Sequence, residues 1–214
     1  MENTAITESV SKKEKLFVLA DHYVNEQISF REAGDRDLPA DAIELLETEW
    51  KKDTEREPSD PERPHWNEIL ITEYGNIRTH IASCDTNQSF GQIGRSSRHT
   101  YLVDMQGDDV LGYGAIYVEN PQSPNEIKVG WTGTFDVKKT RTGKDFTRTG
   151  LNVRRLIVMN AYCLRHYQKP LHSSLAQLAF AEDAWKALVD AGFAEEVREE
   201  DRSFKSGKRQ YRFK

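Results

Sequence analysis

The segment that most constrains the fold is residues 151–167 (LNVRRLIVMNAYCLRHY), because its pattern is the strongest helix signal in the chain. Its apolar side chains recur at helical spacing, and Pro170 stands shortly after the expected end of the helix. Strand-like runs lie on both sides of it, at 127–137 and at 171–174. Helices that alternate with strands pack on a sheet, so we expect an α/β (α+β) fold. The apolar positions of the helix are Leu156, Ile157, Met159, Ala161 and Leu164.

The N-terminal half of the chain predicts a strand, two helices and a loop. The alternating run 28–32 predicts a half-buried strand, and a helix that begins near Asp37 follows it. A second helix is expected over 65–81, where apolar residues that include Trp66 mark one helical face. The polar stretch 84–98 has the composition of a mobile loop.

The next elements are a hairpin and a late helix. Strand-like runs at 99–105 and 110–118 flank a turn rich in glycine and aspartate, which predicts a β-hairpin. A helix is expected from about 180 to 191. It stops at Gly192, which suits the left-handed residue that often follows a helix. Two short strands are expected after it.

Composition and charge limit the class of protein. With 214 residues, of which 37% are hydrophobic and 30% charged, the chain suits one compact domain. We expect 28–214 to form that domain and 1–27 to form an N-terminal extension that is helical from about residue 11. The net charge of -5 argues against a protein that coats nucleic acid. No apolar stretch is long enough to span a membrane, so we expect a cytoplasmic protein.

The cysteines and histidines predict no metal site. Cys84 and Cys163 are far apart and lack the spacing of metal ligands, so we expect reduced thiols and neither a disulfide nor a zinc site. The six histidines show no ligand spacing and no triad pattern. His172 is the histidine of functional interest, because it falls on the expected strand 171–174.

Three stretches resemble segments of the GNAT superfamily of N-acetyltransferases. Residues 28–50 (ISFREAGDRDLPADAIELLETEW) resemble its first strand and helix, and residues 100–118 (TYLVDMQGDDVLGYGAIYV) resemble its hairpin of second and third strands. Residues 181–197 (AEDAWKALVDAGFAEEV) resemble its penultimate helix, which ends in a Gly-Phe pair. The resemblance covers 28–214. It implies a GNAT-like mixed, mainly antiparallel sheet of six to seven strands flanked by helices, with acetyl-CoA or another acyl-CoA as cofactor.

The resemblance also implies where the cofactor binds. In the family, the pyrophosphate lies on amides at the start of the third helix, where unpaired N–H groups and the helix dipole favour an anion. In this chain that helix is 151–167. Gly150 stands at the family's central glycine, where a residue without a side chain lets the backbone approach. The residues expected to bind the cofactor are Gly143, Lys144, Arg148, Thr149, Gly150 and Leu151.

Positive charge gathers in the same part of the chain. Residues 138–155 hold seven Lys and Arg residues against a single acid, Asp145. Such a run suits the phosphates of coenzyme A. Two other interpretations stay open: a solvated basic loop, and a loop that docks on an acidic partner. A fourth, contact with nucleic-acid phosphates, is opposed by the acidity of the chain as a whole.

Four residues are candidates for proton transfer. A base for an amine would stand on or near the family's fourth strand, where Glu126 and Asp136 are the available carboxylates. His172 would lie beside the cofactor cleft on the fifth strand, where a neutral imidazole can accept a proton. Tyr162 is a candidate for the acid that protonates the departing thiolate, and Tyr167 and water are others.

The acceptor pocket has one marker in the sequence. Trp131 interrupts the expected fourth strand among Gly130, Thr132 and Gly133. It either lines the acceptor pocket or marks a bulge in the strand. The acceptor amine itself, on a small molecule or a protein, has no readable pattern in the sequence.

Four positions depart from the family's motifs and leave two functions open. The cofactor motif would need Arg or Gln at Thr147 and a small residue at Asn152. The family's cofactor-contacting Asn and its thiolate-protonating Tyr are replaced by Ala181 and Leu188, and leucine cannot donate a proton. The first function is an acyl-CoA-dependent N-acyltransferase that transfers acetyl to an amine. The alternative is a catalytically inactive binding or assembly module that uses the basic run and the N-terminal helix to hold a macromolecular partner or a second copy.

Overall fold

The structure is a computed structural model of the chain. It describes residues 28–54, 62–74, 76–89, 92–119, 127–134, 150–173, 179–198 and 209–214. The expected N-terminal extension, 1–27, and the greater part of the basic run, 138–149, lie outside the described residues. The predictions made for those two segments therefore stay predictions.

One sheet of nine strands crosses the described part of the chain, in the order β1-β2-β3-β4-β5-β6-β7-β9-β8. Its five long strands are all antiparallel to their neighbours among these five. They are β2 (Glu68–Tyr74), β3 (Ile77–Ser89), β4 (Gln92–Gln106), β5 (Asp109–Glu119) and β6 (Ile127–Thr134). The four short strands are β1 (Arg31–Glu32), β7 (Leu171–His172), β8 (Ala194–Glu196) and β9 (Tyr211–Phe213). The mixed, mainly antiparallel class is confirmed, whereas the expected six to seven strands is wrong.

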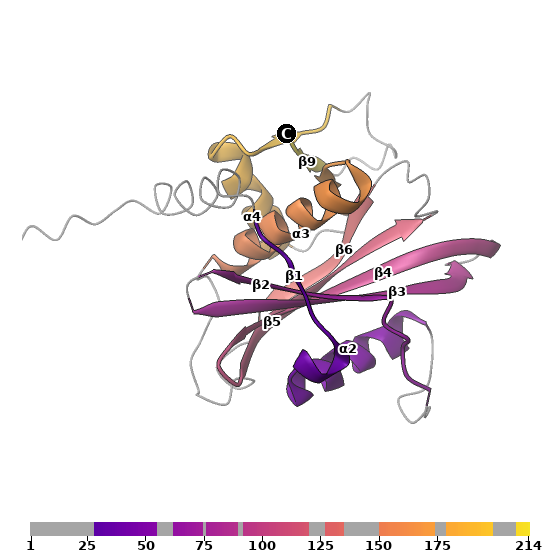
Figure 1. Cartoon of the computed structure of the whole chain (residues 1–214). Helices are drawn as coiled ribbons and strands as arrows, with labels where there is room; N and C mark the ends of the chain where they lie inside the picture. The colour runs from indigo at the N-terminus through magenta and orange to yellow at the C-terminus, as the bar shows by residue number, and fades with distance from the viewer. Residues whose placement is uncertain are drawn as a thin grey trace, which may run out of the picture.

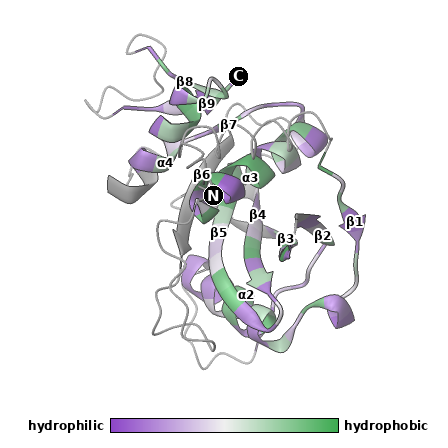
Figure 2. Ribbon diagram, turned by 90° about the vertical axis from the view of Figure 1, so that its left-hand side faces the viewer, coloured by the Kyte–Doolittle hydropathy of each residue, from purple (hydrophilic) through white to green (hydrophobic). Residues whose placement is uncertain are grey.

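Helices cover both faces of the sheet. α2 (Ala40–Asp53) lies on one face, and α3 (Leu151–Tyr167) and α4 (Ala179–Asp190) lie on the other (Figure 1). Each face has its own hydrophobic core, with Trp50 of α2 in one and Leu156 of α3 in the other. Strands β4 and β5 pass between these layers and carry hydrophobic residues (green in Figure 2). No helix in the described part is long and apolar enough to cross a membrane. A 3-10 turn, η1 (Asp35–Asp37), precedes α2.

The helix expected over 65–81 is wrong, because this segment forms β2 and the start of β3. Its apolar residues are buried on both faces: Leu70 and Ile81 pack in the α3 core, and Ile69 and Ala82 pack in the α2 core. A strand covered on both faces has apolar residues at successive positions. Its sequence therefore lacks the alternation of a half-buried strand and can be mistaken for a helical pattern.

The mobile loop expected over 84–98 is also wrong. β3 continues to Ser89 and β4 begins at Gln92, and the two strands pair with each other along this stretch. Asp85 stands opposite Arg98 in this pairing, and their side chains form an ion pair with a nitrogen–oxygen distance of 2.7 Å. Opposite charges that face each other across two strands stabilise the pairing, so a polar stretch can form strands.

The remaining elements lie close to their predicted bounds. The hairpin is confirmed as β4 and β5, and the strongest helix is confirmed as α3. Gly192 after α4 has φ of 87°, which confirms the left-handed residue expected there. Cys84 and Cys163 are free thiols, and both are buried.

Candidate functional site

Strands β6 and β7 form a parallel pair, which comprises two residue pairs within the described residues. Ile127 stands opposite Leu171, and Lys128 stands opposite His172. Ser173 continues the pairing of β7 with β9, since its N–H donates to the carbonyl of Tyr211 at 2.8 Å, and residues 174–178 lie outside the described part of the chain. β6 continues to residue 134. Within the described part of the chain, its edge facing β7 has no strand partner over 129–134. An edge of this kind, where no strand pairs with it, offers backbone groups that can bind an extended ligand.

β6 also contains a β-bulge at Gly130. Ala115 of β5 pairs with Trp131 and the next residue, Ile116, pairs with Val129, so Gly130 is the extra residue of the β6 strand. The bulge interpretation of this glycine-rich stretch is thus confirmed. A bulge bends the strand, takes backbone groups out of the ladder and changes their direction. Bulges often occur beside active sites.

The start of α3 has the form of an anion site. Gly150 is the N-cap, with φ of 88°, a left-handed conformation that favours glycine. The first intrahelical bond runs from the N–H of Arg154 to the carbonyl of Gly150. The first turn of α3 contains no acidic residue, and Gly150 makes no side-chain cap bond. The amides that precede the first intrahelical bond, together with the helix dipole, favour a negatively charged ligand here.

Two arginines of the basic run point into the protein. Arg154 and Arg155 have side chains 2% and 0% exposed, and both bind the carboxylate of Asp104 on β4. Burial lowers the pKa of Arg155, and the charge of Asp104 opposes this effect. The expectation that the whole run 138–155 faces phosphates is therefore wrong for these two residues. They fix the helix to the sheet.

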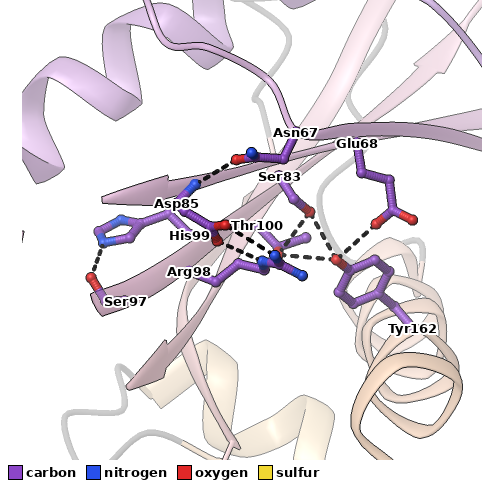
Figure 3. A network of polar contacts seen from close by, with 9 residues as sticks. All are labelled: Asn67, Glu68, Ser83, Asp85, Ser97, Arg98, His99, Thr100 and Tyr162. Carbon is purple, nitrogen blue, oxygen red and sulfur yellow. Dashed lines mark hydrogen bonds and ion pairs between the residues drawn. The ribbon is translucent and has the colours of Figure 1, made fainter. Parts of the chain in front are cut away.

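A second polar network holds the C-terminal half of α3 against the sheet (Figure 3). The hydroxyl of Tyr162 donates to Oε2 of Glu68 at 3.1 Å. It also lies 2.8 Å from Oγ of Ser83, which must then be the donor of that bond. Ser83 lies 3.0 Å from Thr100, its partner across β3 and β4. Burial raises the pKa of Tyr162, so this phenol is a poor source of protons.

The same network reaches partly exposed charged groups. Nε2 of His166 lies 3.6 Å from Oε1 of Glu68, and burial lowers the pKa of His166. Sequence analysis missed Glu68, Ser83 and Thr100, because they come from three strands, one of which was expected to be a helix. The available signal was the position of Ser83 and Thr100 among apolar neighbours, where a strand buries a hydroxyl that needs a partner.

The four catalytic candidates do not form one cluster. Glu126 and Asp136 lie outside the described residues. His172 lies on β7, paired with Lys128 on β6 and with Arg212 on β9. Tyr162 lies elsewhere: Asn160 of α3 accepts a bond from the N–H of Leu171, and Tyr162 is about 200° further round the helix. The structure therefore turns Tyr162 away from β7 and toward β3 and β4.

The six expected cofactor-binding residues divide in the same way. Gly143, Lys144, Arg148 and Thr149 lie outside the described residues. Gly150 and Leu151 lie together at the start of α3, as predicted, with the Leu151 side chain buried in the core. Residues of the described part contain no cluster of three metal-ligating side chains.

A surface cleft of about 470 Å³ lies apart from this region. It is lined by residues of α2, such as Ile43 and Glu47, and by Arg63. Because α2 covers the opposite face of the sheet from α3, this cleft belongs to neither α3 network.

Comparison with known proteins adds no relative: no family model, curated protein or solved structure matches the chain. The functional assignment consequently depends on the geometry of β6, β7 and α3 and on the sequence pattern.

Proposed function

We propose that the chain is an acyl-CoA-dependent N-acyltransferase whose cofactor lies between β6 and β7. The observation that carries this proposal is the parallel β6–β7 pair, short within the described residues, with α3 in the connection between its strands. The edge of β6 beyond the described pairs suits the amides of an extended pantetheine chain, and the amides after Gly150 suit a pyrophosphate. In parallel sheets, ligands bind where neighbouring strands separate.

Acyl-CoA would supply the acyl group as a thioester, which an amine can attack directly. The bulge at Gly130 directs backbone groups of β6 out of the ladder, where an N–H can stabilise the negative charge that develops on the carbonyl oxygen. His172 stands in the last described residue pair of β6 and β7, and we assign it the proton of the attacking amine, which it passes to the thiolate of coenzyme A as the carbon–sulfur bond breaks. Glu126 and Asp136 are the alternative bases. Tyr162 has no part in this mechanism because its hydroxyl belongs to the buried network.

A matched pair of glycine variants tests the cofactor site. Gly150 and Gly192 both have left-handed φ, 88° and 87°, so alanine at either position has a similar backbone cost of about 1 kcal/mol. Only Gly150→Ala should weaken the binding of acetyl-CoA in a calorimetric titration, by roughly tenfold or more. Wild-type protein that shows no binding, or equal affinity in the two variants, would contradict the proposal.

One observation favours the second candidate, a binding module without turnover. Leu188 stands at the position of the tyrosine that protonates the thiolate in the family. It is 1% exposed and packs in the α3 core. Its place is thus structural, and no proton donor replaces it there. An acetyl-transfer assay against a panel of amines separates the two: turnover supports the enzyme, and cofactor binding without any turnover supports the module.

A further inference from the structure

The ion cluster beneath α3 has an unusual distribution of charge. Oδ1 of Asp104 accepts a bond from Arg154 at 2.9 Å, and Oδ2 accepts a bond from Nε of Arg155, also at 2.9 Å. Two adjacent residues of one helix thus share a single carboxylate, which is itself fully buried. The three groups together carry one excess positive charge.

Such a cluster is a poor device for stability alone. Cations at a helix N-terminus oppose the helix dipole, and each buried ion loses its hydration. Apolar residues of similar volume often replace a buried ion cluster with no loss of stability. What the ions add is orientation, because guanidinium and carboxylate groups bind in fixed geometry.

The contacts of the cluster join the first turn of α3 to β3 and β4, and they include one bond within the turn itself. Arg154 also donates to Oγ1 of Thr79 at 2.6 Å, on β3. Arg155 also donates to Oδ1 of Asn152 at 2.9 Å, within the same turn. Asn152, which departs from the family's motif, thereby acquires a role: it orients Arg155. Opposite Asp104 on β5 stands Gly112, which has no side chain.

We propose that Asp104 is a positioning residue for the anion site at the start of α3. Through Arg154 and Arg155 it holds the amides after Gly150 at a fixed place relative to the sheet. This inference rests on the proposed function, because it takes the anion to be the pyrophosphate of coenzyme A.

The test replaces the cluster by apolar residues: Asp104→Leu, Arg154→Met and Arg155→Met in one variant. Its melting temperature should stay within about 4 °C of wild type, which corresponds to about 1 kcal/mol. The dissociation constant for coenzyme A should rise roughly 10- to 100-fold, since small misplacement of binding groups has effects of this size. The control is Asp85→Asn with Arg98→Gln, which removes an ion pair on β3 and β4 away from α3's first turn and should leave that constant unchanged.

Hydrogen exchange at 150–155 without ligand gives a second measurement. The apolar variant should exchange faster there than wild type, while α4 should be unaffected. If the triple variant fails to fold, Arg155→Lys takes its place, because lysine keeps the charge and loses the fork geometry. A folded variant with wild-type affinity and wild-type exchange at 150–155 overturns the inference. If wild-type protein itself does not bind coenzyme A, the proposed function fails, and the exchange measurement alone then decides whether Asp104 positions this turn.

Discussion

The two faces of β3 and β4 are buried by different chemistry. Toward α3, the strands present Thr79, Ser83, Thr100 and Asp104, all of which bind polar side chains of the helix or of each other. Toward α2, alternate positions of the same strands present apolar and aromatic residues with two buried histidines. Both helices thus pack on hydrophobic side chains of the sheet, and α3, which begins at the candidate site, is held by directional bonds in addition.

This difference indicates which helix needs a fixed position. Hydrophobic packing gives most of the stability of a domain and tolerates small shifts, whereas charged hydrogen bonds set orientation. We infer that α3 carries the site and that α2 is a structural cover. The predictions that follow are ordered by the size of their expected effect on this contrast.

The largest effect should come from Asp104→Ala on the α3 face. Loss of this carboxylate leaves two buried guanidinium groups without their shared partner, so the free energy of unfolding should fall by about 3–5 kcal/mol. Urea unfolding measures this. A decrease in the free energy of unfolding below about 1 kcal/mol would show that the cluster is solvated. The two faces would then not differ in the buried charge that holds their helices.

The α2 face should dominate the dependence of stability on pH. Burial lowers the pKa of both His80 and His99 to about 4. Because the unfolded chain titrates near its ordinary pKa of about 6.5, it binds more protons below that pH, so stability falls as pH drops from about 6.5 to about 4. Each histidine should account for roughly 2 kcal/mol between pH 7 and pH 5.

Urea unfolding of the variant His80→Gln at the two pH values checks this assignment. The variant should lose its share of the decrease and retain the part due to His99. If the free energy of unfolding of the variant decreases as much as that of wild type, His80 does not cause the pH dependence. Water would then reach the α2 face more than its packing indicates.

Tyr162→Phe should have a smaller effect, of roughly 1–2 kcal/mol, because Ser83 and Glu68 lose their partner. Affinity for coenzyme A should not change. The matched control is Tyr211→Phe, whose hydroxyl bonds Glu182 at 3.4 Å near the surface and should matter less. Loss of acetyl transfer in a Tyr162→Phe variant of wild-type stability would instead make Tyr162 the catalytic acid.

The smallest effect should come from an exposed pair, Arg212 with Glu195, whose nitrogen–oxygen distance is 2.7 Å. Arg212→Ala should change the free energy of unfolding by less than about 1 kcal/mol, because water screens exposed charges. A loss as large as that of Asp104→Ala would remove the distinction between buried and exposed pairs on which the α3 account depends.

Sequence analysis predicted elements whose pattern is local. α3 has apolar residues that recur at helical spacing, and Gly192 follows α4 with a residue suited to left-handed φ. β2 was missed because both its faces are buried, which removes the period-two signal. The cluster of Asp104 with Arg154 and Arg155 was missed because about fifty residues separate its members along the chain, and only the fold brings them together.

At the candidate site, the sequence located the start of α3 through Gly150 and left its surroundings open. No local pattern in the sequence reports that β6 and β7 pair in parallel, since pairing is a property of the sheet. The bulge at Gly130 was one of two interpretations of a glycine-rich strand. The roles of Gly143, Lys144, Arg148 and Thr149 stay predictions.

The most direct test of this account is hydrogen exchange of wild-type protein with and without saturating coenzyme A. The account predicts slower exchange at the first turn of α3 and along β6, with no change in α2. Exchange that is unchanged at 150–155 while coenzyme A is bound, or protection confined to the α2 face, would contradict it.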